Sequence, residues 1–435
     1  MRKVLFFPLL MMALQLMAAP SDTTRHGHWT DRFKMHGFVN PVLFADTRQV
    51  VSGREGMMHF FPTAPSYDSD GFDLNSIPSM NMLAITARLN LSIEGPRFLG
   101  AATHSYIEGD FTGATEPTIN MFRLRHAYVD MQWKHHSFLA GQYWHPMVIH
   151  EIMPMTQPLN MGAPFHPYAR YNQFRYSFHT GKFEALAVAA FQLDNKSQGW
   201  NGSSTQYLRT AMVPEMNLQV RYNGDRLLLG AAANYRQLLP HSSYIDAQGN
   251  SHRCQSTYSN IAYTLYGKFR MEGWSIKAQT LLNDDLYEIS SIGGYISSYN
   301  VLSNTEMDPY TYEPWTFTTL WADFSRTKGH WRPGIFMGYA KNNDFGRSVN
   351  NSTATLTHSG MEVYGRGFNI EYLYRVQPRI EYYATGGLTF SLELEHTFAQ
   401  YGNKVSDGTT GYHYESAPDM GVANTRGIFG ILYSF

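Results

Sequence analysis

The sequence predicts an all-β protein, a 16-stranded antiparallel transmembrane β-barrel with short periplasmic turns and long extracellular loops. Three observations predict this class. An export signal is followed by no run of about 18 apolar residues, so we expect no membrane-spanning helix. Apolar and polar residues alternate with period two in many short segments. Turns of roughly two to four residues alternate along the chain with loops of roughly ten to thirty, as in outer-membrane barrels.

Composition sets this chain apart from an ordinary soluble enzyme. Charged residues make up 16% of the 435 residues, against about 25% in typical globular domains, and aromatic residues make up 15%. The net charge of -1 provides no field to attract nucleic acid. The single cysteine, Cys254, lies in a predicted loop and excludes an intrachain disulfide or a cysteine-based zinc site.

Residues 1–19 read as a secretory signal peptide. Arg2 and Lys3 supply the positive charge, Val4–Met12 the apolar region, and Met17–Ala19 a small-residue cleavage site. Residues 20–33 are polar, and we expect a short periplasmic N-terminal segment. The transmembrane β-barrel is expected over residues 34–435.

The first strands are expected at 34–46 and 83–94, separated by a loop rich in glycine and proline over 47–79. In the second strand Leu83, Ile85 and Leu89 share one face, opposite Thr86 and Arg88. A third strand follows the turn at 95–97, and its polar face carries His104, Tyr106, Glu108 and Asp110.

The hairpin 122–132 and 136–144 shows the alternation in its sharpest form. Phe122, Leu124 and Tyr128 fall on one face, and Arg123 and Arg125 on the other. A soluble sheet with a buried apolar face would show the same pattern. In a membrane barrel the sense is reversed, with lipid outside and water inside.

Strands continue at similar spacing to the C-terminus. Residues 361–385 allow either two strands, for a total of 17, or one strand over 364–384 with Pro378 off the ladder. Bacterial barrels have even strand numbers, so we expect one strand and 16 in all. A strand at 388–399 and a loop at 400–423 precede the closing strand, in which Phe429, Ile431, Tyr433 and Phe435 share a face. The other expected strands are 171–180, 183–192, 216–222, 226–237, 261–271, 274–283, 315–327 and 330–341.

Three segments resemble a porin family. Tyr106–Gly113 (YIEGDFTG), Phe122–Val129 (FRLRHAYV) and Leu139–Trp144 (LAGQYW) are similar, in order and spacing, to the core of DcaP-like trimeric porins, which are related in pattern to phosphate-selective porins. The similarity covers about forty residues. It implies a trimeric, 16-stranded barrel for small solutes, often with an anion preference. It also implies that Glu108, Asp110, Arg123, Arg125 and Gln142 are wall positions.

If the apolar faces contact lipid, the alternation predicts the residues that line the lumen. The basic candidates lie on other strands than most acidic ones, which suggests two walls of opposite sign and a transverse field. Arg88, Arg123 and Arg125 could form part of a constriction, or they could be structural partners of Glu108 and Asp110; both interpretations stay open. The predicted pore-lining residues are Arg88, Glu108, Asp110, Arg123, Arg125, Arg175, Arg221, Lys268, Arg270, Glu393 and Glu395, with Glu94 and Arg236 as further lumen candidates.

The loop 144–170 is a candidate for folding into the lumen, where His145, His150, Glu151 and His166 could line the opening. The alternative is a surface loop or a latch onto a neighbouring subunit. His26, His28 and His36 invite a metal site, but the pattern positions no carboxylate partner, so we expect neither metal nor cofactor.

The function we expect is passive diffusion of small polar solutes, with a lean to anions or dicarboxylates, in the outer membrane of a Gram-negative bacterium. No G-x-S-x-G motif is present, so we expect no enzyme. The alternatives are an adhesion or structural barrel with a plugged lumen, an outer-membrane hydrolase and a soluble periplasmic sandwich. The expected partners are the bilayer, the solute, two further copies in a homotrimer and the barrel assembly machinery, which would recognise Phe435.

Overall fold

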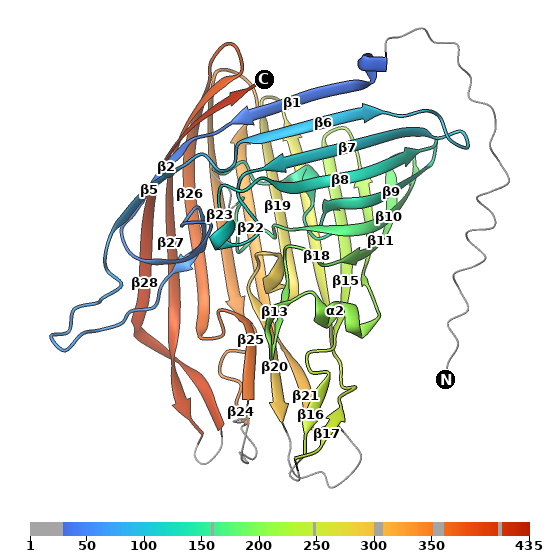
Figure 1. Cartoon of the computed structure of the whole chain (residues 1–435). Coiled ribbons are helices and arrows are strands. Elements are labelled where there is room, and N and C mark those ends of the chain that lie inside the picture. The colour runs from blue at the N-terminus through green and yellow to red at the C-terminus, as the bar shows by residue number, and fades with distance from the viewer. Residues whose placement is uncertain (1–28, 158–160, 247–248, 300–307, 351–360, 408–410) are drawn as a thin grey trace.

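The computed structural model describes residues 29–157, 161–246, 249–299, 308–350, 361–407 and 411–435. Strands make up 64% of it, and sixteen antiparallel strands of the described chain close into a barrel. Closure is made by β28 (Gly411–Ser434), which pairs with both parts of the first strand, β1 (Phe33–Val39) and β2 (Val42–Asp46). The prediction of a closed 16-stranded barrel is therefore confirmed (Figure 1).

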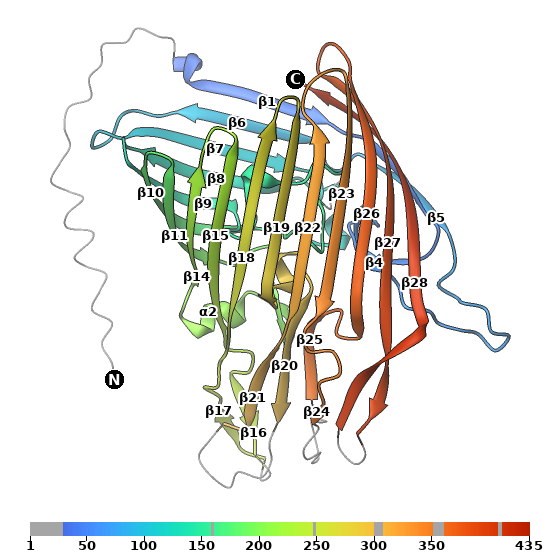
Figure 2. The ribbon, with the colours of Figure 1, turned by 180° about the vertical axis from the view of Figure 1, so that it is seen from behind.

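The second wall strand is formed by β5 (Ser79–Leu83) and β6 (Arg88–Glu94), which pair with β2 and β1 respectively. The remaining wall strands pair with their neighbours in chain order, and Figure 2 shows them as a continuous wall from behind. They are β7 (Ala102–Asp110), β8 (Arg123–Gln132), β9 (His136–Trp144), β10 (Arg170–Thr180), β11 (Phe183–Phe191), β14 (Glu215–Asn223), β15 (Leu227–Leu238), β18 (Tyr258–Met271), β19 (Trp274–Asp284), β22 (Phe317–Arg326), β23 (Trp331–Asn342), β26 (Ile370–Tyr383) and β27 (Leu388–Ser406).

The long connections carry short elements of their own, most of which gather at the end of the barrel opposite the C-terminus (Figure 1). A 3-10 helix precedes the first strand. The elements outside the wall are η1 (Trp29–Arg32), β3 (Val50–Gly53), β4 (Met58–Pro62), η2 (Glu116–Thr118), η3 (His150–Ile152), β12 (Ser197–Gly199), β13 (Gly202–Ser204), α2 (Gln206–Ala211), β16 (Ser243–Ile245), β17 (Ser251–Arg253), η4 (Tyr287–Ile289), β20 (Gly293–Tyr299), β21 (Tyr310–Trp315), β24 (Val349–Asn350) and β25 (Met361–Arg366).

The outer face of the barrel is apolar. Side chains such as Leu218, Val220 and Leu265 are more than half exposed, while their neighbours Asn217, Gln219 and Thr264 are buried on the inner side. Near the short turns, aromatic pairs such as Trp274 and Phe324, whose ring centroids lie 4.7 Å apart, fit a membrane-interface girdle. In the described part of the chain, no helix is both long and apolar enough to cross a membrane.

Three local predictions about strand boundaries were wrong. The chain turns at 84–87, where the Ala87 N–H donates to Ala84 O, so Ile85 is buried inside while Leu89 is exposed outside. The expected strand 364–384 starts only at Ile370, because 361–366 instead form β25, which pairs with β20. Most of the expected loop 400–423 continues the β27–β28 ladder. Pro378 lies within β26, although the β26–β27 pairing skips it.

A fourth correction concerns Tyr128. A bulge between β7 and β8 places two residues, Arg125 and His126, where regular pairing has one. The alternation flips there, so Tyr128 faces inward with Tyr106 and Tyr143, and Val129 faces outward. The Gln142 amide donates to the carbonyls of Leu124 and Arg125 at 3.1 and 3.0 Å and so satisfies the backbone of the bulge.

Gly141 lies opposite Tyr128 with φ +132°, and a Cβ there would sit 2.2 Å from Ala127 O. We expect Gly141→Ala to destabilise the barrel by about 2 kcal/mol, through backbone strain and this clash. Gly427→Ala is the matched control, because a Cβ at Gly427 meets nothing within 4 Å. Urea unfolding in detergent measures both; equal midpoints for the two variants would contradict the strain at Gly141.

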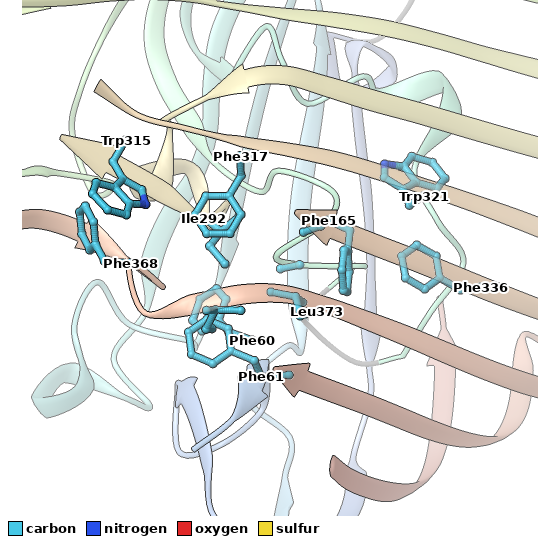
Figure 3. Close-up of a cluster of buried hydrophobic side chains, with 14 of the residues drawn as sticks. Phe60, Phe61, Phe165, Ile292, Trp315, Phe317, Trp321, Phe336, Phe368 and Leu373 are labelled. Carbon is cyan, nitrogen blue, oxygen red and sulfur yellow. The ribbon is translucent and has the colours of Figure 1, made fainter. Parts of the chain in front are cut away.

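The largest apolar cluster lies on the inner side of the wall. Trp321 and Phe336 on β22 and β23 pack near Phe165 from the connection between β9 and β10, and Phe60 and Phe61 of β4 join the same cluster beside Leu373 (Figure 3). Chain segments that the sequence places in loops thus contribute to a core inside the barrel.

Candidate functional site

A network of arginines and carboxylates covers the inner side of β6, β7 and β8. Arg125 Nε lies 2.7 Å from Glu108 Oε1, and Arg125 Nη1 lies 2.7 Å from Asp110 Oδ2. Arg123 Nε contacts Asp110 Oδ1 at 2.8 Å, and Arg88 Nε approaches Glu108 at 3.6 Å. The structure therefore brings the three predicted arginines and the two predicted carboxylates together as ion pairs, the arrangement expected for buried charges.

Tyr168 joins this network from the connection between β9 and β10. Its hydroxyl accepts hydrogen bonds from Arg125 Nη1 at 3.0 Å and from Arg170 Nη1 at 3.2 Å. Burial opposes ionisation of the phenol, but the guanidinium groups of Arg125 and Arg170 outweigh this and lower the pKa of Tyr168 to about 7. The positive charges of Arg125 and Arg170 therefore converge on this hydroxyl.

A polar cavity of about 270 Å³ opens beside Tyr168. Its lining contains five cationic residues, Arg54, Arg123, Arg170, Lys196 and Arg366, and two acidic ones, Asp194 and Glu288. Glu288 is held by Arg236, and Arg123 is paired with Asp110.

Two guanidinium groups in this cavity are not matched by protein carboxylates. Arg170 is 4% exposed; its guanidinium lies over the rings of Trp144 and Tyr168, and its Nε has no hydrogen-bond partner in the described chain. Arg366 is half-buried, lies over the Phe60 ring at 3.8 Å and donates to the carbonyl of Ser291 at 2.9 Å. Within the described residues, neither guanidinium has a carboxylate oxygen within 4.0 Å. An incoming anion could supply the missing charge.

The other predicted basic residues lie apart from this cavity. Arg221 is paired with Glu184 at 2.6 Å and Glu151 at 2.5 Å, and Lys268 donates to the carbonyl of Glu151. Arg175 lies over the Tyr143 ring and donates to the carbonyl of Trp144. Arg270 contacts the turn at 224–225 near the barrel end. Glu94 is exposed and paired with Lys34.

Glu393 and Glu395 lie on β27, buried among basic residues that were not predicted from the sequence. Glu395 contacts His59 and lies 3.6 Å from Arg375, and Glu393 accepts hydrogen bonds from Gln157 N and Gln377 Nε2. The prediction of two walls of opposite sign was wrong, because Arg375, Arg379 and Arg426 lie on the expected acidic wall.

Some of these unpredicted basic residues could have been found from the sequence pattern. Arg375 and Arg379 alternate with the apolar or aromatic residues Tyr374, Val376 and Ile380, so the period-two pattern of β26 places both on the inner face. Arg170 and Arg366 lie at the edge of a strand and in a loop hairpin, where no periodic pattern marks them.

The connection 145–169 contacts inner-face side chains of many wall strands. His145 is hydrogen-bonded to Glu215 on β14 at 2.8 Å, and Lys277 on β19 donates to Met153 O at 2.8 Å. Arg375 on β26 donates to Ala163 O at 2.7 Å. Of the other histidines predicted there, His166 is buried against Trp321, and His150 begins η3.

No group of three or more potential metal ligands is found among the described residues. His26 and His28 lie outside the described residues, and His36 lies on β1 opposite Asn90. Cys254 is a buried free thiol.

No protein-family model matches the sequence, and no curated protein matches it either. Solved structures are similar in fold. The outer membrane channel DcaP of Acinetobacter baumannii gives a TM-score of 0.60 at 15% identity, covering 93% of this chain and 97% of that one. The anion-selective porin from Comamonas acidovorans gives 0.54 at 10% identity, covering 93% and 99%. OmpF of Salmonella typhi, solved with daunomycin, gives 0.50 at 11% identity, covering 93% and 97%.

These similarities confirm the resemblance to DcaP-like porins at the level of the fold. A closed barrel of this fold with an apolar outer face is a protein of the bacterial outer membrane, as the sequence predicted.

Proposed function

We propose that this outer-membrane barrel is a passive, non-enzymatic porin for small polar solutes, and that anions cross it more readily than cations. The observation that carries the proposal is the cavity that contains Arg170 and Arg366, two guanidinium groups with no carboxylate oxygen of the described residues within 4.0 Å, although Asp194 and Glu288 also line this cavity. A fixed positive charge of this kind attracts anions and raises their local concentration.

Two guanidinium groups in one cavity also favour a solute with two acidic groups. Arginine binds carboxylates through parallel hydrogen bonds, so a dicarboxylate could engage Arg170 and Arg366 together. The connection 145–169 would narrow the lumen beside this cavity, through its contacts with β14, β19 and β26. Arg88, Arg123, Arg125, Glu108 and Asp110 would form the wall around it.

We also propose how the protein is assembled in the outer membrane. A homotrimer in the bilayer fits the resemblance, and Phe435 at the end of β28 would be the signal for the barrel assembly machinery.

A barrel with a plugged lumen is the second candidate, favoured by the apolar cluster inside the wall.

Purified protein in planar bilayers discriminates the porin from the plugged barrel. We expect stepwise conductance and, in a tenfold KCl gradient, a reversal potential of the sign given by chloride preference. Conductance with a potassium-selective potential would contradict the anion preference, and its complete absence would support the plugged barrel.

A further inference from the structure

The first part of the long loop 47–78, through Pro62, enters the same interior as the connection 145–169, whereas Tyr67, Phe72 and Leu74 in its second part are more than half exposed. Its hairpin of β3 and β4 carries side chains that are almost fully buried, among them Met57, His59, Phe60 and Phe61. β4 packs against β27 and β28, the last two wall strands. The connection 145–169 begins after β9, which lies in another part of the wall. Burial this deep is unusual for a surface loop.

One wall residue holds both loops. Arg375 on β26 is 0% exposed, and its Nη1 donates to Ala163 O of the connection 145–169 at 2.7 Å. Its Nη2 donates to Phe60 O at 3.0 Å and to His59 O at 3.3 Å, both in the loop 47–78. A guanidinium is the side chain best suited to this task, because its five donors diverge in one plane.

Further contacts of the loop 47–78 with the wall support the same position. The Tyr401 hydroxyl on β27 donates to Pro62 O at 2.7 Å, and His59 Nδ1 is hydrogen-bonded to Glu395. Thr397 on β27 accepts from Arg375 Nε at 2.8 Å and orients the guanidinium.

The two loops also share one apolar cluster. Figure 3 shows Phe60 and Phe61 close to Leu373 on β26, with Phe165 on the same side and Phe336 beyond it. Phe60 in turn borders the cationic cavity, together with Ser52, Arg54 and Met58 of the same loop.

We propose that the loop 47–78 is a second constriction loop, and that Arg375 is the positioning residue that holds it against the connection 145–169. This inference rests on the proposed porin function. The apolar cluster closes the side of the lumen next to β22–β27, so solutes pass on the side lined by Arg54, Arg123 and Arg170. The size limit of the pore is then set by two loops rather than by one.

The test compares Arg375→Gln and Arg375→Lys with the wild type in planar bilayers. Glutamine cannot reach all the carbonyls, so both loops loosen; we expect about twofold higher conductance, because conductance grows with the open cross-section. Lysine keeps the charge but not the planar fork, so we expect an intermediate value. Arg379→Gln is the control, since Arg379 faces inward on the same strand but pairs with Asp323 on the wall.

A second readout follows the loop itself. In a Cys254→Ser background, the thiol introduced by Phe60→Cys should react slowly with a membrane-impermeant maleimide, and at least several-fold faster once Arg375→Gln is added. If Arg375→Gln fails to fold, judged by heat-modifiable migration, the pair Phe60→Ser and Phe61→Ser loosens the loop without touching the wall. We expect the same rise in conductance from this pair.

The outcomes separate this inference from the proposed function. A wild-type protein that gives no conductance in planar bilayers would contradict the porin proposal itself. In the other outcome the wild type conducts, but the loop-loosening substitutions change neither the conductance nor the maleimide labelling of the Phe60→Cys variant. That combination would overturn the proposed role of the loop 47–78. That result would leave the porin proposal standing.

Discussion

The double variant Arg170→Gln and Arg366→Gln is expected to lose most of the anion preference. Both guanidinium groups face one polar cavity and have no carboxylate partner in the described chain. Two charges at contact distance interact by about 1 kcal/mol in water and by about 4 kcal/mol near a protein surface. Taking the low end of that range, we expect the permeability ratio of chloride to potassium to fall by about fivefold.

The matched control removes two positive charges elsewhere. Arg226 and Arg326 are exposed at the short turns, away from the cavity, so Arg226→Gln with Arg326→Gln lowers the net charge by the same amount. Reversal potentials in asymmetric KCl compare the two pairs. Equal shifts in both would mean that the overall charge of the barrel, and not this cavity, sets the selectivity.

Removing Arg426 is expected to weaken the closure of the barrel. Arg426 on β28 and Asp46 on β2 are register partners across the seam between the last and the first strand. The guanidinium binds both carboxylate oxygens, at 2.8 and 2.7 Å, and the two side chains are 0% and 2% exposed. Arg426→Met leaves Asp46 buried with the Asn424 amide as its remaining side-chain donor among the described contacts, which should cost about 3–5 kcal/mol.

The double variant Asp46→Leu with Arg426→Met serves as the control, because an apolar pair leaves no charge uncompensated. We expect it to recover most of the lost stability. Urea titration in detergent, followed by tryptophan fluorescence, measures both variants. A single variant as stable as the wild type would show that the seam is closed by the backbone ladder alone.

The strand plan was largely predictable. The alternation of apolar and polar residues predicted the wall strands from 102 to 342 to within a few residues, because every wall residue must choose between lipid and the interior. The predictions failed where a local feature interrupts the period of two. The turn at 84–87, the bulge at Arg125 and the hairpin at 361–366 each redirect the chain without a residue pattern that announces it.

The site was predictable only in part. The motif residues Glu108, Asp110, Arg123 and Arg125 do lie together, but as ion pairs that satisfy one another. The two guanidinium groups that carry the proposed selectivity, Arg170 and Arg366, come from positions where the strand pattern ends.

By itself, the sequence determined the class of fold and the lipid-facing side of most strands, because these follow from the local alternation of side chains, and the even strand number of bacterial barrels gave the count of 16. The tertiary structure alone decided which charges are matched and which are left over, and which loops turn inward to meet Arg375. Some of these contacts join residues more than two hundred positions apart, such as Ala163 and Arg375, and no local pattern encodes such a distance.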